Sequence, residues 1–272
     1  MLEPEALGSK EKFWYRAKVG EPEWLFKFPQ VHTGQHWAEK VAAEVARALE
    51  ILHARVELAD FQGTIGSATE SFARDGRNLF HGNQILAGKV LDYDAEKEFR
   101  QSNHTLANIF TAIDRTFTTP EGAHKAKLNF ANYLLLDSVI SNTDRHHENW
   151  GILRKRMENR WQGMLAPTFD HASSLGRELV DVSDGKCRER LLREKRGGNY
   201  SEKGHGAIYW ERTDKRALSP LELVRRAAVF YPDLFRPALA RLEHLDRTKL
   251  TSIIRRIPLS VSLRWQGISP LN

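Results

Sequence analysis

The sequence predicts an α+β fold with two lobes, a small antiparallel β lobe that contains one helix and a larger lobe that is mostly helical. The first third of the chain alternates between apolar and polar residues, with one helical stretch in the middle. The remainder repeats its apolar residues at helical spacing, apart from one short hairpin. We place the boundary after residue 75, so that the expected lobes are residues 1–75 and 76–272.

The small lobe is expected to have the element order β-β-α-β-β. Four stretches that alternate in polarity are predicted to be strands, and they are residues 13–19, 23–28, 56–61 and 64–72. Gly20-Glu21-Pro22 separates the first pair and Gly63 separates the second, and such residues favour turns. Between the two pairs, apolar residues recur at helical spacing from Gln35 to about His53.

The larger lobe alternates long helices with one hairpin and one charged segment. Helices are expected at residues 105–117 and 123–141, and short strands at residues 149–154 and 161–166. Residues 177–216 have little apolar periodicity and hold 11 Lys or Arg against 8 Asp or Glu, which predicts a long, mobile, charged segment. Short amphipathic helices are expected from Ser219-Pro220 to about Arg256.

The composition restricts the classes of protein to which this chain can belong. Hydrophobic residues make up 41% and charged residues 28%, an ordinary globular balance, and no apolar run is long enough to cross a membrane. Cys187 is the one cysteine, and the first residues do not resemble a signal peptide, so we expect a cytoplasmic protein. The net charge of +6 favours anionic partners, but no zinc finger or aromatic-basic strand accompanies it, so direct nucleic-acid binding is not expected.

One stretch between a buried helix and an apolar strand concentrates the residues that carry chemistry. It reads SNTDRHHENW from Ser141 to Trp150, and Asp170 follows the next predicted strand. Phosphoryl transfer needs one carboxylate near the incoming hydroxyl, together with an Asn and a second carboxylate that hold Mg²⁺. Asp144 and Asn149 have the D-x-x-x-x-N spacing of kinase catalytic loops. We therefore predict a two-lobed, protein-kinase-like fold, with a catalytic loop at residues 141–154 and a metal-binding segment at residues 166–176.

Two other interpretations of these residues remain open. Asp144 and Asn149 could belong to a polar surface turn and cap neighbouring elements. A transition-metal site could use Asp144 with three histidines, His146, His147 and His171. Adjacent histidines on one turn rarely converge on a single ion, which argues against the second interpretation.

The small lobe supplies a lysine that suits a nucleotide. Lys27 shares one strand face with Leu25, and bulky aromatic residues take the other face. A lysine that points inward among apolar neighbours needs an anionic partner, and the phosphates of ATP would provide one. The alternative is a surface lysine on a half-exposed strand. We expect Lys27 to be oriented by a helix glutamate, with Glu44 preferred and Glu39 as second choice, although either could be a solvated helix charge.

A phosphate-covering loop is the least developed part of the pattern. Gly8-Ser9-Lys10-Glu11-Lys12 precedes the first strand and has a single glycine. Its backbone N–H groups and Ser9 could cradle phosphates, or the segment could be a frayed end.

These motifs resemble the HipA-like kinases, the toxin-type bacterial serine/threonine kinases. The resemblance rests on NTDRHHEN followed by APTFDHASSLG, on TESFAR as a hinge segment, and on Lys27. It implies that Asp144 is the catalytic base, that His146 and Asn149 face the nucleotide and metal, and that Asp170 binds Mg²⁺. The last hundred residues match only in helical character.

The resemblance extends to the hinge and to regulation. It implies that backbone groups of Glu70 and Phe72 hold adenine, and that a serine of the phosphate loop, here Ser9, is autophosphorylated. An antitoxin partner is left open, since we expect the chain to lack the additional N-terminal subdomain of full-length HipA.

The expected function is therefore an ATP- and Mg²⁺-dependent kinase that phosphorylates Ser or Thr of a protein substrate. The D-R-H-x-x-N order also resembles phosphoinositide 3-/4-kinases, so a lipid kinase is one alternative, although no membrane-binding segment is evident and stable membrane association is not expected. A degenerate kinase that retains ATP as a structural ligand is the other. Residues 177–216 would suit an acidic or tRNA-associated protein substrate, or no specific partner at all.

Overall fold

The computed structural model describes residues 3–4, 11–16, 18–31, 33–158, 160–177 and 204–257. The chain divides into two compact units. Unit 1 consists of residues 1–71 together with 170–200 and 244–272, and unit 2 consists of residues 72–169 and 201–243. The first division thus falls four residues before the expected one, since it follows residue 71 and not residue 75. Two segments that we expected in the larger lobe, 170–177 and 244–257, belong instead to unit 1.

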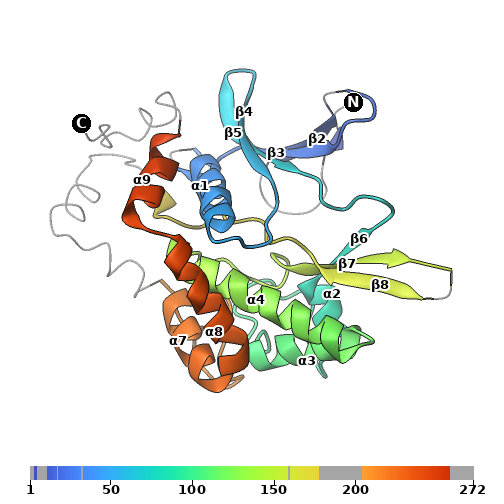
Figure 1. Cartoon of the computed structure of the whole chain (residues 1–272). Helices are drawn as coiled ribbons and strands as arrows, with labels where there is room; N and C mark the ends of the chain where they lie inside the picture. Colours follow the sequence, from blue (N-terminus) through green and yellow to red (C-terminus); the bar gives the residue numbers. More distant parts are fainter. Residues whose placement is uncertain are drawn as a thin grey trace. The chain divides into compact units, whose positions relative to one another are not determined.

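Unit 1 is built on a five-stranded antiparallel sheet with the order β1-β2-β3-β5-β4 (Figure 1). The strands are β1 (Glu3–Pro4), β2 (Lys12–Arg16), β3 (Glu23–Lys27), β4 (Val56–Phe61) and β5 (Thr64–Glu70). Helix α1 (Gln35–Ala48) lies between the two hairpins in sequence and packs against β4 and β5, and α9 (Arg247–Arg255) packs against α1. The four predicted strands and the helix between them are confirmed as β2, β3, α1, β4 and β5, whereas the two-residue strand β1 was not predicted.

Aromatic side chains from three strands fix the register of β3, which carries Lys27. The Phe26 ring is buried and stacks on Phe13 with a centroid distance of 5.2 Å. Phe28 and Phe61 complete the cluster. Because side chains alternate along a strand, burying Phe26 on one face places Lys27 on the other.

Unit 2 is built around helix α4 (Pro120–Ile140). This helix begins at Thr119, whose hydroxyl accepts a hydrogen bond from the N–H of Gly122. Helices α3 (Leu106–Thr116), α7 (Pro220–Phe230) and α8 (Pro232–Ala240) all pack against it, and α2 (Gly82–Ala87) packs against α3 (Figure 1). The neighbours bury α4 on several sides, including Phe130, Tyr133 and Leu136. A short 3-10 helix (Arg241–His244) follows α8.

A second antiparallel sheet, with the order β6-β7-β8, supports the loop after α4. Its strands are β6 (Asn78–His81), β7 (Gly151–Arg156) and β8 (Trp161–Leu165). The hairpin of β7 and β8 was predicted, whereas β6 and α2 were not, because four- and six-residue elements are too short for a periodic pattern.

Within the described residues, we find no helix long and apolar enough to span a bilayer.

Candidate active site

The predicted catalytic loop is held at both ends by regular structure of unit 2. Helix α4 ends because Ser141 is left-handed, with φ of 55°, and the N–H of Asn142 donates back to the carbonyl of Asp137 at 2.9 Å. Strand β7 begins at Gly151, where an added Cβ would lie 2.5 Å from the carbonyl oxygen of Phe80. Glycine there lets the end of the loop run against β6.

A buried arginine inside the loop determines its course. The guanidinium of Arg145 donates to both carboxylate oxygens of Asp137, with Nε–Oδ2 and Nη2–Oδ1 distances of 2.8 and 2.7 Å. Its Nη1 donates to the carbonyl of Asn149 at 2.7 Å and reaches the carbonyl of Phe169 at 3.4 Å. Asn142 also donates to Asp137. One side chain thus joins α4 to the end of the loop and to the residue before Asp170.

The backbone of Asp144 is held by three hydrogen bonds within the loop. Its carbonyl accepts the N–H of His146 at 2.8 Å and the side-chain amide of Asn149 at 2.6 Å. Its own N–H donates to the side chain of Asn142. Asp144 is partly exposed, whereas Arg145 and Asn149 are buried. This arrangement presents one accessible carboxylate beside a fixed amide, which suits a general base beside a metal ligand.

Two histidines behind the loop are neutral structural links. The Trp150 indole N–H can only donate, so Nε2 of His104 accepts it at 3.2 Å and the Nδ1–H of His104 donates to the carbonyl of Ala207. Nδ1 of His147 lies 2.9 Å from the Tyr93 hydroxyl. Burial lowers the pKa of His104 to about 3 and that of His147 to about 4.

These histidines should make unit 2 sensitive to acid. Both bind a proton more readily when unfolded, near the ordinary histidine pKa of 6.5, so their stabilising contribution is present above pH 6.5 and is lost as pH falls toward 4 and then 3. Each unit of pKa difference corresponds to about 1.4 kcal/mol. We expect the urea-unfolding free energy to fall less steeply between pH 7 and pH 4 in His147→Phe than in the wild type. The exposed His124→Gln should retain the wild-type slope, and equal slopes in all three proteins would contradict the assignment.

In unit 1, the predicted nucleotide lysine meets the predicted metal-binding carboxylate. Nζ of Lys27 lies 3.0 Å from Oδ2 of Asp170, and both side chains are mostly buried. Asp170 adopts a left-handed backbone conformation with φ of 55°, which Asp tolerates better than most residues. The carboxylate of Asp170 thus pairs with a cation.

Helix α1 supplies a second carboxylate to the same place. Oε1 of the buried Glu39 lies 3.5 Å from Nδ1 of the buried His171, the residue after Asp170. Burial favours the neutral acid, but His171 and the charge of Lys27 outweigh it and hold the pKa of Glu39 below its usual value. Glu39 therefore ties α1 to the metal-binding segment.

Comparison with known proteins shows the family of this chain. Residues 6–228 match the family model of the HipA-like C-terminal domain. The chain belongs to this family. It is 26% identical over 186 residues to the serine/threonine-protein kinase CtkA of Helicobacter pylori strain J99, an alignment that covers 65% of this chain and 53% of that relative. The chain thus spans about half the length of this curated relative.

Solved structures confirm the fold of this HipA-like domain. The Helicobacter pylori proinflammatory kinase CtkA superposes with a TM-score of 0.73 at 21% identity, covering 94% of this chain and 85% of that one. HipA from the Shewanella oneidensis MR-1 toxin–antitoxin complex with HipB and operator DNA superposes with a TM-score of 0.53 at 16% identity, covering 98% and 60% respectively. The predicted α+β, kinase-like fold class is confirmed.

In this HipA-like domain, Glu44 pairs with cations other than its predicted partner, Lys27. The carboxylate of Glu44 lies 2.9 Å from Nζ of Lys40, and it also pairs with the guanidinium groups of Arg47 and Arg256. Burial would raise the pKa of Glu44, but these three cations outweigh it and keep the carboxylate charged. The structure thus directs Glu44 to these cations and not to Lys27, and the second choice, Glu39, is the α1 carboxylate near that lysine.

The side chains of the alternative transition-metal site, Asp144 and the three histidines, have other partners. His147 contacts Tyr93, and Nε2 of His146 lies 3.6 Å from Oε1 of Glu98. Among the described residues, the group with metal-ligand spacing is His146 with two glutamates, Glu98 and Glu148. His171 pairs with Glu39 instead.

Other predicted site residues lie at the division between the units or outside the described residues. Glu70 ends β5, and its N–H donates to the carbonyl of Arg55 at 2.9 Å. Phe72, the first residue of unit 2, has its ring centroid 5.3 Å from that of Phe169. Ser9 and residues 178–203 of the charged segment lie outside the described residues.

Three supporting residues were missed by sequence reasoning. Arg145 lies within the motif and Asp137 interrupts an apolar stretch of residues 133–140, but no role was predicted for either of them from the sequence. His104 carries no local signal, because its partners are 46 and 103 residues away. A charged residue inside an apolar helix, as at Asp137, is the one sequence signal that could have indicated a buried ion pair.

Proposed function

We propose that this HipA-like domain is an ATP- and Mg²⁺-dependent serine/threonine protein kinase. The observation that carries the proposal is the loop in which His146 and Asn149 fix the backbone of a partly exposed Asp144. The Lys27–Asp170 pair and the kinase relative of the family support it.

The chemistry of the proposed ligands suits a magnesium ion. Asn149 and Asp170 offer the oxygen ligands that Mg²⁺ prefers, and the contact of Lys27 with Asp170 marks a carboxylate that already accepts a cation. Mg²⁺ would neutralise charge on the phosphates. Lys27 would bind the α- and β-phosphates, and Asp144 would accept the proton of the substrate hydroxyl. Most of the acceleration would come from positioning and electrostatics.

The remaining assignments complete the proposal. The carbonyl of Glu70 and the N–H of Phe72 would hydrogen-bond adenine, His146 would lie toward the nucleotide, and Ser9 would contact the phosphates or be autophosphorylated. The partner would be a cytoplasmic protein with a Ser or Thr acceptor. The toxin–antitoxin complex among the similar structures supports testing an antitoxin as a further partner.

The test is incubation of the whole chain with γ-labelled ATP and Mg²⁺, with and without a cell extract, followed by mass spectrometry of the labelled species. We expect label on serine or threonine, and loss of transfer when Mg²⁺ is chelated. In a parallel titration, Asp170→Asn should weaken Mg²⁺-dependent nucleotide binding. Label in lipid would instead support a lipid kinase, and ATP binding without any transfer would support a non-catalytic module.

A further inference from the structure

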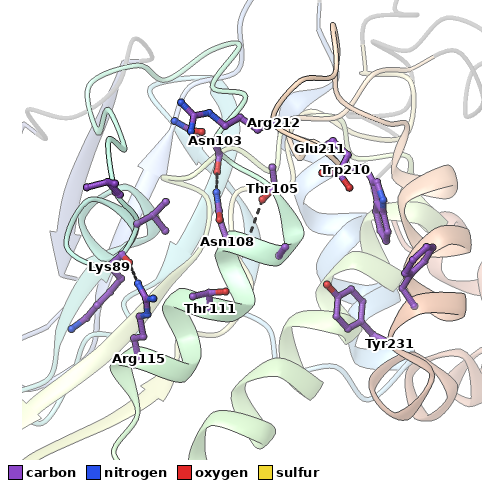
Figure 2. Close-up of a pocket in the computed structure, with 14 residues that line it drawn as sticks. Lys89, Asn103, Thr105, Asn108, Thr111, Arg115, Trp210, Glu211, Arg212 and Tyr231 are labelled. Atoms are coloured by element: carbon purple, nitrogen blue, oxygen red, sulfur yellow. Dashed lines mark hydrogen bonds between the residues drawn. The ribbon is translucent and has the colours of Figure 1, made fainter.

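A hollow of about 550 Å³ lies within unit 2 and has no part in the proposed chemistry. Figure 2 shows that the exposed side of α3, with Thr111 and Arg115, forms its floor. The chain after α2 forms one wall, and the segment from Trp210 to Arg212 together with the junction of α7 and α8 forms the other. Its volume is within the range of sites that hold several side chains or a small ligand.

The wall around α7 is aromatic and accessible. The rings of Trp210 and Phe230 meet edge to face with a centroid distance of 5.0 Å, although 66% of Phe230 remains exposed. Tyr231 packs on Phe110 at 5.1 Å, and burial raises its pKa, so its hydroxyl is a donor at neutral pH. Trp and Tyr are the side chains most enriched at the energetic centres of protein interfaces.

The charge of the hollow is positive. Lys89, Arg115 and Arg212 line it, against a single carboxylate from Glu211. The Arg115 guanidinium donates to the carbonyl of Lys89, which holds the arginine along one rim. Leu91, on the same side, is 84% exposed. The surface thus combines cations with accessible apolar groups, which complements an acidic segment that carries apolar side chains.

The hollow is continuous with the support of the catalytic loop. Asn103 and Thr105 line it, and His104 between them binds Trp150 at the end of the loop. Thr105 forms a parallel bridge with Tyr209, whose N–H donates to the carbonyl of His104. The aromatic wall is therefore attached to the same backbone that holds the loop, so an occupant would be presented at a fixed position relative to Asp144.

We propose that this hollow is a docking site for an acidic segment of the protein substrate, anchored by an aromatic or aliphatic side chain against Trp210 and Phe230. The inference rests on the proposed function for the identity of the partner as a substrate. A nucleic acid is disfavoured because Glu211 and the exposed Leu91 interrupt any continuous track of cations for phosphates.

The first test measures binding without ATP, so that it does not depend on catalysis. The probe is a fluorescein-labelled synthetic peptide with one tryptophan and one leucine among aspartates and glutamates. We expect fluorescence anisotropy to show binding that Lys89→Glu/Arg212→Glu and Phe230→Ser each weaken by about tenfold or more. The matched controls are Arg225→Glu/Arg236→Glu, with the same change of charge, and Val229→Ser, because these exposed residues of α7 and α8 do not line the hollow.

Several outcomes would overturn the docking site. The first is that the acidic peptide does not bind. The second is that the hollow variants and the control variants bind it equally. The third is that a peptide in which lysines replace the acidic residues binds as well as the acidic peptide. Displacement by a single-stranded oligonucleotide, with the probe peptide no better than that oligonucleotide, would assign the hollow to nucleic acid instead. Thermal unfolding of each variant checks that it is folded.

The second test links docking to catalysis. A serine substrate fused to the acidic segment should have a KM raised about tenfold by the hollow variants, with kcat largely retained, because docking contributes equally to ground and transition states. An unchanged KM in the hollow variants would show that the hollow does not dock the substrate. Peptide binding without any phosphotransfer would contradict the proposed kinase activity but would still support the docking site.

Discussion

Asp144→Asn is expected to lower phosphotransfer by about 10²–10⁴-fold, because it removes the proposed general base. The substitution keeps the shape of the side chain. The loop should also persist, because His146 and Asn149 donate to the backbone carbonyl of Asp144, which the substitution retains. Nucleotide affinity should therefore change little while single-turnover transfer from γ-labelled ATP falls.

The control for this loss is Asp114→Asn, which removes a half-exposed carboxylate of α3 that pairs with Lys127. We expect its transfer rate to stay within about twofold of the wild type, as for most surface substitutions. Equal transfer by the wild type and Asp144→Asn would contradict the assignment of the base. A parallel loss of ATP binding would show that Asp144 acts in binding and not in proton transfer.

Arg145→Met is expected to cost about 3–5 kcal/mol of unfolding free energy. The side chains of Arg145 and Asp137 are each only 3% exposed, so the substitution leaves a buried carboxylate without its cation. The carbonyl of Asn149 would also lose its donor. Urea unfolding measures the loss, and phosphotransfer should fall with it, because the position of Asn149 depends on this contact.

Two comparisons separate the buried charge from a general effect of losing arginine. Arg226→Met breaks an exposed pair with Glu222 and should cost less than about 1 kcal/mol. Asp137→Leu/Arg145→Met removes both buried charges and should recover part of the lost stability. If Arg145→Met were no more destabilising than Arg226→Met, the buried pair would not hold the loop.

Local sequence patterns were sufficient to predict the strands and helices that bury one face. The alternation of residues 56–61 predicted β4 with its observed bounds, and Ser219-Pro220 predicted the start of α7, where the hydroxyl of Ser219 accepts the N–H of Glu222. The helix predicted from Gln35 ends earlier than expected, at Ala48. The pattern continues to Leu52, whereas the chain turns at Glu50 with φ of 55°.

The proximity of two candidate site residues was predictable from their spacing. Asp144 and Asn149 belong to one loop, and their separation in sequence sets their separation in space. Glu44 was not predictable, because helical periodicity cannot reveal a partner such as Arg256, which is 212 residues away. The inward direction of Arg145 likewise depends on Asp137 in the folded core. Local sequence names the reactive groups, and tertiary contacts decide what holds them.

The ion pair between Lys27 and Asp170 has a consequence for ligand affinity. The ammonium group of Lys27 is an internal counter-ion for the carboxylate of Asp170. If metal and nucleotide bind here as proposed, a metal ion alone would compete with that ammonium group, and a nucleotide alone would draw the ammonium group away from the carboxylate. When both arrive together, each charge gains a new partner, so metal and nucleotide should strengthen each other's binding by the same factor.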